Sequence, residues 1–224
     1  GTTNTLVDCA DGSQKGAFYV KGHPEFSKSG VLNVVGNLKH AIKAGEYVSL
    51  KEATINVTSA AGDGINCAQY FLMESGTINI SGVEDDGIQC DIDDTEVGPT
   101  GQTTDHEDED SGNIYLEGGA IRINIAGKAA KGIKSEGDMI ISGGTINVTT
   151  TGHGKWDDEN LKTKAAACLS SDAKVVISGG TLTLTSTGAG GKGINCDTEF
   201  ELSGGDVTVV TTGGLYYNNG TTEN

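Results

Sequence analysis

The richest group of carboxylates in the chain lies in the stretch GVEDDGIQCDIDD, residues 82–94. One repeat earlier, Asp63 and Asn66 occupy the positions of Asp86 and Gln89. Like charges this close repel each other unless a cation lies among them, and Ca²⁺ takes six to eight carboxylate and amide oxygens. A solvated acidic corner without a metal is the alternative. The pattern predicts a calcium site with these candidate ligands: Asp63, Asn66, Asp85, Asp86, Gln89, Asp91, Asp93 and Asp94.

Lysines take over the equivalent positions in later repeats. Lys131 and Lys192 match Asp86, and Lys134 matches Gln89. Their ammonium groups could pair with the carboxylates of an acidic ligand or simply balance the charge of the acidic repeats. A lyase would need one lysine as a base, with a lowered pKa and a nearby calcium ion. Because no arginine accompanies these lysines, we expect no enzyme activity.

The segment GHGKWDDENLKTK, residues 152–164, contains the only tryptophan, Trp156. An indole face can stack on the C–H face of a sugar ring, and Asp157 could accept hydrogen bonds from sugar hydroxyls. Alternatively, Trp156 anchors this segment on the body of the protein. The residues expected to contact a ligand are Trp156, Asp157, Lys131, Lys134 and Lys192.

The run DHEDED, residues 105–110, does not match an EF-hand loop. A charge run of this kind is typical of a solvated loop. The sharper alternative is that it shares a calcium ion with the 85–94 cluster.

These side chains lie in, or in inserts within, a phrase that repeats about every 23 residues, with longer intervals where there are inserts. The phrase contains a Gly-Ile pair, a turn that is often Gly-Gly, and a strand such as TINVT at 145–149. Repeats of this length are typical of solenoids. Each copy has three alternating segments, and alternation gives each segment an inward apolar face.

Stacking the copies aligns three inward columns, which predicts an all-β fold, a three-sided parallel β-helix of about seven coils. We expect it to be right-handed, as parallel crossovers nearly always are. We expect a single domain with an N-terminal cap (1–28), coils (29–215) carrying inserts at 91–113 and 152–165, and a tail (216–224). Cys67, Cys90 and Cys196 share one inward position and are predicted to be buried thiols.

The formal net charge of −16 excludes nucleic acid and anionic membranes as partners. No run of about 18 apolar residues is present, so we expect no membrane insertion. We expect a monomer.

The phrases KGIKSEGDMIISGGTINVTTTG (131–152) and KGINCDTEFELSGGDVTVVTTGG (192–214) resemble the repeats of bacterial secreted carbohydrate-binding β-helix domains, which are adhesin-like. This resemblance implies a pectate-lyase-like fold without obvious lyase machinery, bound calcium, and affinity for acidic or cellulosic cell-wall polysaccharide.

The resulting hypothesis is a non-catalytic module, extracellular or on the cell surface, that binds cell-wall polysaccharide, including uronate-rich polymers, with the help of calcium. Two alternatives stay open: a surface adhesin that binds host glycan or protein, and a calcium-dependent uronate polysaccharide lyase.

Overall fold

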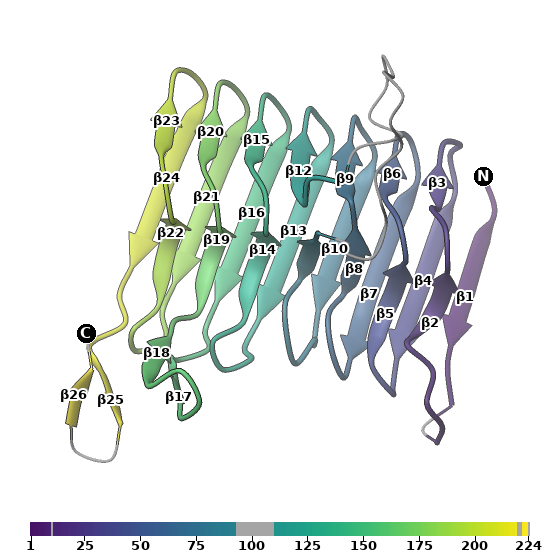
Figure 1. Cartoon of the computed structure of the whole chain (residues 1–224). Helices are drawn as coiled ribbons and strands as arrows, with labels where there is room; N and C mark the ends of the chain where they lie inside the picture. Colours follow the sequence, from purple (N-terminus) through teal and green to yellow (C-terminus); the bar gives the residue numbers. More distant parts are fainter. Residues whose placement is uncertain (10, 93–109, 219–220, 224) are drawn as a thin grey trace.

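The computed structural model describes residues 1–9, 11–92, 110–218 and 221–223, and the regular elements in these ranges are all β-strands. Three parallel sheets run the length of the molecule and enclose one core (Figure 1). Neighbouring strands of each sheet come from successive turns of the chain, and the strand order confirms the three-sided parallel β-helix. Two of the three sheets have seven strands each, in agreement with about seven coils.

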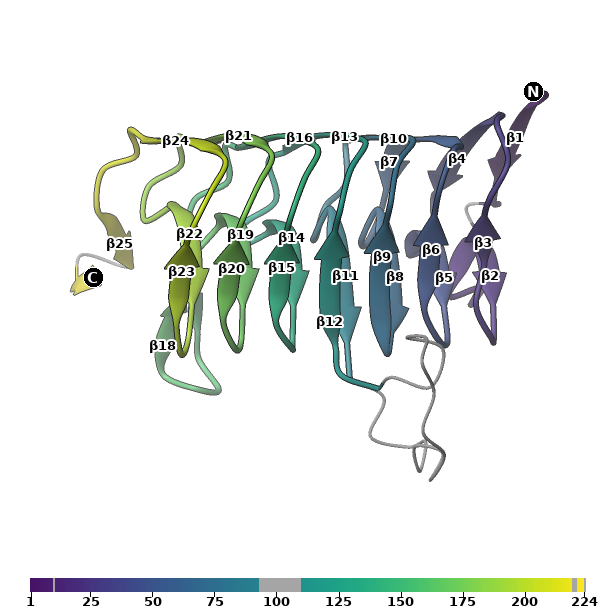
Figure 2. The same cartoon turned by 90° about the horizontal axis from the view of Figure 1, so that it is seen from above.

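Sheet A, seen edge-on along the top of Figure 2, is the longest of the three. Its strands are β1 (Thr3–Val7), β4 (Val31–Gly36), β7 (Thr54–Ala60), β10 (Thr77–Ser81), β13 (Ala120–Ile125), β16 (Thr145–Thr150), β21 (Thr181–Ser186) and β24 (Asp206–Thr211). Sheet B consists of β2 (Gly16–Val20), β5 (His40–Ala44), β8 (Ile65–Ala68), β11 (Ile88–Asp91), β14 (Lys131–Ser135), β19 (Ala167–Ser171) and β22 (Lys192–Cys196). Sheet C consists of β3 (Glu25–Phe26), β6 (Val48–Leu50), β9 (Tyr70–Met73), β12 (Asn113–Leu116), β15 (Met139–Ile141), β20 (Val175–Ile177) and β23 (Phe200–Leu202).

The pairing register places equivalent residues of successive repeats side by side. Ile88 pairs with Ile65 on one side and with Ile133 on the other, and all three are fully buried. Side chains alternate across a strand, so the residue after each of these isoleucines faces outward. Residues about two dozen positions apart therefore become neighbours on the outer surface of sheet B, roughly 4.8 Å apart.

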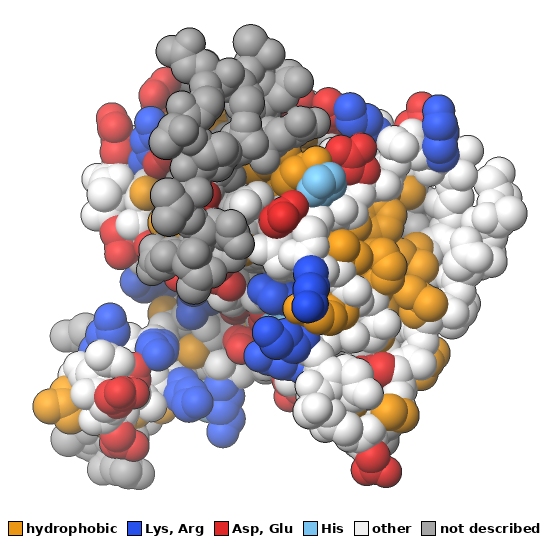
Figure 3. Space-filling view, turned by 45° about the vertical axis from the view of Figure 1, so that its right-hand side comes forward, with side chains coloured by type: hydrophobic (Ala, Val, Ile, Leu, Met, Phe, Trp, Pro, Cys, Tyr) orange, Lys and Arg blue, Asp and Glu red, His pale blue; other side chains and the backbone are white. Residues whose placement is uncertain are grey.

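The last coil departs from the expected burial. Phe200, Leu202 and Val209 were expected to face the core, but their exposed fractions are 46%, 52% and 44%. The expectation is wrong here because β22, β23 and β24 are the last strands of their ladders, and no coil among the described residues covers their apolar side chains. Apolar side chains are also visible at the N-terminal end, which comes forward in Figure 3.

The segment 1–28, expected to be a cap, contributes one strand to each sheet. β1 pairs with β4, β2 with β5 and β3 with β6. In the turns, the second glycine of a pair adopts a left-handed conformation, as at Gly144 with φ +87°. A side chain there would be strained, which explains the repeated Gly-Gly.

Two short antiparallel hairpins extend from the solenoid. The insert 152–165 forms β17 (Lys155–Asp157) and β18 (Lys162–Lys164), and the tail forms β25 (Tyr216–Asn218) and β26 (Thr221–Glu223). Residues 105–109 of the charged run 105–110, and most of the insert 91–113, lie outside the described residues.

The buried-thiol prediction is confirmed for Cys67 and Cys90, which are free and fully buried, whereas Cys196 is only half-buried. Among the described residues, no helix has the length and apolarity that crossing a membrane requires.

Candidate functional site

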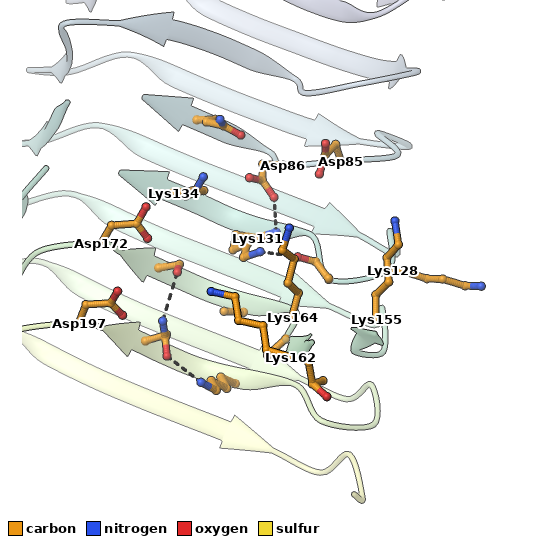
Figure 4. Close-up of a pocket in the computed structure, with 18 residues that line it drawn as sticks. Asp85, Asp86, Lys128, Lys131, Lys134, Lys155, Lys162, Lys164, Asp172 and Asp197 are labelled. Carbon is orange, nitrogen blue, oxygen red and sulfur yellow. Dashed lines mark hydrogen bonds between the residues drawn. The ribbon is translucent and has the colours of Figure 1, made fainter. Parts of the chain in front are cut away.

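A hollow of about 530 Å³ lies over β14, β19 and β22 of sheet B. Seven lysines and four aspartates line it, and we call it the lysine pocket. The chain has only 15 lysine and arginine residues in total and a net charge of −16, so this hollow departs strongly from the average charge of the protein. The lysines that line the hollow are Lys128, Lys131, Lys134, Lys155, Lys162, Lys164 and Lys192 (Figure 4).

The register of sheet B positions three of these lysines. Lys131 aligns with Ala167 and then with Lys192, two coils further along. Lys134 follows the buried Ile133 and therefore faces outward beside Ser170. The Nζ of Lys192 donates a hydrogen bond to Oδ1 of Asn195 at 2.8 Å. The structure thus brings Lys131, Lys134 and Lys192 together, as the repeat alignment predicts.

Three more lysines come from the β17–β18 hairpin. Lys155 pairs with Lys164 across it, and Lys162 pairs with Asp157. Figure 4 shows Lys155, Lys162 and Lys164 on one side of the pocket and Asp172 on the other.

Asp157 holds this hairpin together. Its carboxylate lies 2.8 Å from the Nζ of Lys164 and accepts hydrogen bonds from the N–H groups of Glu159 and Asn160. Hydrogen bonds from Lys164 and Asn160 hold the pKa of Asp157 below its ordinary value. The same hydrogen bond raises the pKa of Lys164. The carboxylate of Asp157 therefore makes its contacts within the hairpin that carries Lys155, Lys162 and Lys164.

An acidic corner adjoins the lysine pocket. Asp63, Asp85 and Asp86 approach one another so that one carboxylate oxygen from each lies within 4.8 Å of the others, and Asp85 and Asp86 also line the pocket (Figure 4). Burial raises the pKa of Asp86 to about 7. Burial, and then the charge of Asp63, raise the pKa of Asp85. Carboxylate oxygens are the ligands that Ca²⁺ prefers, and a cation here would relieve the repulsion, so the three residues fit such an ion.

The aspartates of this corner also connect successive coils. Asp63 Oδ1 accepts a hydrogen bond from the N–H of Asp86 at 3.0 Å, and Asp86 Oδ1 accepts one from the N–H of Lys131 at 2.6 Å. These contacts explain why the carboxylates are held inside the corner although burial disfavours their charge.

The other candidate metal ligands are arranged differently. Asn66 donates a hydrogen bond to Asp63 at 2.7 Å, and its Oδ1 accepts one from Lys43. Gln89 donates to Asp91 on the same strand. These side chains form a network beside the three aspartates. Asp93 and Asp94 lie outside the described residues.

Lys131 lies where the acidic corner meets the lysine pocket. Its Nζ donates a hydrogen bond to the carbonyl of Ala129 at 2.7 Å. Burial lowers the pKa of Lys131, although the charge of Asp86 opposes this effect. In Figure 3, basic side chains gather in the lower half of the visible face, with acidic side chains among them.

Trp156 lies on the hairpin strand β17 and does not line the lysine pocket. It is half-buried, and its backbone N–H donates a hydrogen bond to the Oη of Tyr216 at 3.3 Å. The tail therefore contacts the insert.

Several residues of the site are missing from the sequence-based prediction. They are Lys128, Lys155, Lys162, Lys164, Asp172, Asp197 and Tyr216. The K-T-K run at 162–164 was a usable signal, because alternation puts both of its lysines on one face of a strand. Nothing in the sequence indicates where the insert folds back onto the coils.

The fold and the hollow define the class of this protein: a parallel β-solenoid with a polar, charged hollow on one outer face. The family model described as "Carbohydrate-binding domain-containing protein" matches residues 1–214. The chain belongs to this family, and carbohydrate binding is the activity that the family description gives. No curated protein and no solved structure matches the chain.

Proposed function

We propose that this protein binds an anionic cell-wall polysaccharide, without transforming it, through the lysine pocket. The observation that carries the proposal is the gathering of seven lysines around one hollow in a chain of net charge −16. For a carbohydrate ligand, an anionic group that suits such a pocket is the carboxylate of a uronate residue. Its pairing with ammonium groups gives charge-assisted hydrogen bonds, which are about twice as strong as neutral ones.

Other polar groups of the pocket suit the neutral part of such a ligand. Asp172 and Asp197 line the side opposite the hairpin lysines and can accept hydrogen bonds from sugar hydroxyls (Figure 4). Ser170 and Asn195 lie between them on the sheet and offer both donors and acceptors. The pocket thus combines cations for carboxylates with hydrogen-bond donors and acceptors for hydroxyl groups.

Calcium is the second part of the proposal. Asp63, Asp85 and Asp86 would hold a Ca²⁺ ion, and the ion would supply a positive charge at the acidic end of the pocket, where a ligand carboxylate would otherwise be repelled. Because the polymers concerned are components of cell walls, we expect the protein to act outside the cell or on its surface.

The direct test is retention of polygalacturonate compared with a neutral glucan, with Ca²⁺ and with chelator. We expect retention of the uronate polymer only. The double variant Lys134→Met and Lys162→Met keeps the apolar stems and removes two charges. It should weaken binding about tenfold or more per lysine, because a hydrogen bond to a charged group contributes about 1.5–3 kcal/mol.

The matched control is Lys174→Met, because Lys174 pairs with Asp138 at 3.4 Å and does not line the pocket. Equal affinity of the double variant and the wild type would refute the proposal. Absence of any glycan retention would favour a surface adhesin for a protein partner.

One observation favours a second function. The pKa of Lys131 is lowered by burial, and the residue lies beside the candidate calcium ligands, which is the arrangement that a uronate lyase base needs. Incubation of polygalacturonate with the protein and Ca²⁺ tests this through the ultraviolet absorbance of unsaturated products. Product formation that is lost in Lys131→Met would make the protein a lyase.

A further inference from the structure

A second hollow, of about 290 Å³, adjoins the lysine pocket. Lys128 and Lys155 line both hollows, so these two side chains stand at their common border. The second hollow has a different chemical character, because aromatic rings take the place of most of the lysines. Its lining residues are Lys128, His153, Gly154, Lys155, Trp156, Asp158 and Tyr216. We call it the aromatic hollow.

The rings come from two distant parts of the chain. His153 and Trp156 belong to the 152–165 insert, and Tyr216 begins the tail hairpin. The rings of His153 and Tyr216 are stacked, with centroids 5.9 Å apart and an angle of 14° between their planes. Trp156 is fixed to the same tyrosine through its backbone N–H, 3.3 Å from the Oη of Tyr216.

The hollow is held in shape by the backbone. The N–H of Gly154 donates to the carbonyl of Ala189 at 2.8 Å, and the carbonyl of His153 accepts from Ala129 at 2.9 Å. At Gly190, a Cβ would lie 2.8 Å from the Cβ of Tyr216. The insert and the tail are therefore both fastened to the coils, and the rings do not need a ligand to bring them together. A preformed site binds with a smaller loss of conformational entropy.

The chemistry of the two hollows is complementary for a polymer of acidic sugars. The C–H face of a pyranose ring stacks on an aromatic face, whereas the carboxylate of a uronate pairs with ammonium groups. A single uronate residue can occupy the lysine pocket but not the aromatic hollow at the same time. Only a ligand with at least two linked sugars can use both hollows at once.

We propose that the two hollows are one extended groove for an acidic oligosaccharide, with a carboxylate-bearing residue in the lysine pocket and the neighbouring sugar ring against Trp156 and Tyr216. This inference rests on the proposed function and adds the length of the ligand and the second subsite. Lys128 and Lys155, at the border, contact the linkage region. The C-terminal tail, through Tyr216, becomes part of the binding surface.

The test compares galacturonate with its linear oligomers, using two readouts on the same protein. Calorimetry measures affinity, and the fluorescence of Trp156, the only tryptophan, reports occupancy of the aromatic hollow. We expect oligomers to bind more tightly than the monomer and to change the fluorescence, whereas the monomer should bind without that change. Trp156→Ala should weaken oligomer binding about tenfold and leave the affinity for the monomer unaltered.

Leu161→Asn is the matched control, because Leu161 is 74% exposed in the turn of the same hairpin and lines neither hollow. Asn also tolerates the positive φ of 49° at this position. One outcome would overturn the groove and leave the proposed function standing. In that outcome Trp156→Ala binds oligomers as tightly as the wild type, whereas the double variant Lys134→Met and Lys162→Met binds them more weakly. Failure of wild-type protein to bind any galacturonate ligand would overturn both.

Discussion

The buried carboxylate of Asp86 allows a quantitative prediction about stability. Asp86 is 4% exposed, and burial raises its pKa from the ordinary value of 3.8 to about 7. A pKa that is higher in the folded state means that the folded protein binds the proton more tightly than the unfolded chain does. Between these two pH values the unfolded chain has lost the proton while the folded protein still holds it, so stability falls as the pH rises. Above about pH 7 the loss is complete.

The size of the effect follows from the two values. Their difference, at about 1.36 kcal/mol for each pH unit, corresponds to roughly 4 kcal/mol. Asp86→Asn retains a side-chain oxygen that can accept the hydrogen bond from the N–H of Lys131, but it cannot ionise. The variant should therefore equal the wild type at about pH 4 and exceed its free energy of unfolding by up to about 4 kcal/mol at about pH 8.

Thermal unfolding followed by circular dichroism, with a chelator present at every pH, measures this difference. For a chain of this size we expect the variant to melt up to about 10 °C higher at about pH 8. Asp172→Asn, which changes an exposed carboxylate of the same pocket, should give no such trend. In a separate series without chelator, added Ca²⁺ should raise the melting temperature of the wild type and not that of Asp86→Asn. The reasoning would be refuted if Asp86→Asn melted no higher than the wild type at high pH. It would also be refuted if the variant melted higher by the same margin at every pH.

Three further outcomes follow from burial and backbone geometry. Phe71→Ala should lower the free energy of unfolding by about 3–5 kcal/mol in chemical denaturation. Phe200→Ala, in the exposed last coil, should lower it by less than about 1 kcal/mol. Equal losses would contradict the exposure of the last coil. Gly144→Ala should destabilise the protein by about 1–3 kcal/mol, because its φ is +87°, and an unchanged unfolding midpoint would argue against that turn. A thiol reagent should modify the exposed Cys9 in the native protein, as detected by mass spectrometry. Cys90 is buried, which raises its thiol pKa, and it should react only after unfolding. Modification of Cys90 in the native protein would show that the core opens.

The sequence was sufficient for the fold because the inward residues are few and regular. Ile65, Ile88 and Ile133 occupy one position of the repeat, and a single register satisfies all of them. A shift of one residue would turn these side chains outward, so the apolar pattern strongly specifies the pairing. The end of the solenoid was not predictable in the same way, because Phe200 has the same local pattern as Phe71 and differs only in having no coil above it.

The site was only partly predictable, because some of its residues lie in the repeat and others lie in an insert without a period. Lys131, Lys134 and Lys192 were found because they belong to the repeat, and Asp63 and Asp86 were aligned by the same rule. Lys162 and Lys164 lie in an insert, whose position depends on contacts with the tail and the coils rather than on a period. The role of Asp157 was also hidden, because its pairing with Lys164 arises only when the hairpin closes.

The outer face of sheet B shows how one repeat can carry two opposite chemistries. A single outward position is occupied along the ladder by Lys43, Asn66, Gln89, Lys134, Ser170 and Asn195. The inward neighbours cannot vary much without opening the core, whereas the outward residue changes from coil to coil at little cost in stability. Between β11 and β14 the surroundings of this ladder change from carboxylates to lysines. A uronate polymer lying along the axis would meet both kinds of surface, pairing directly with lysines on one side and requiring a cation on the other. Under the proposed function a neutral glucan would gain from neither kind of surface, so we expect this face of sheet B to select polymers by their charge.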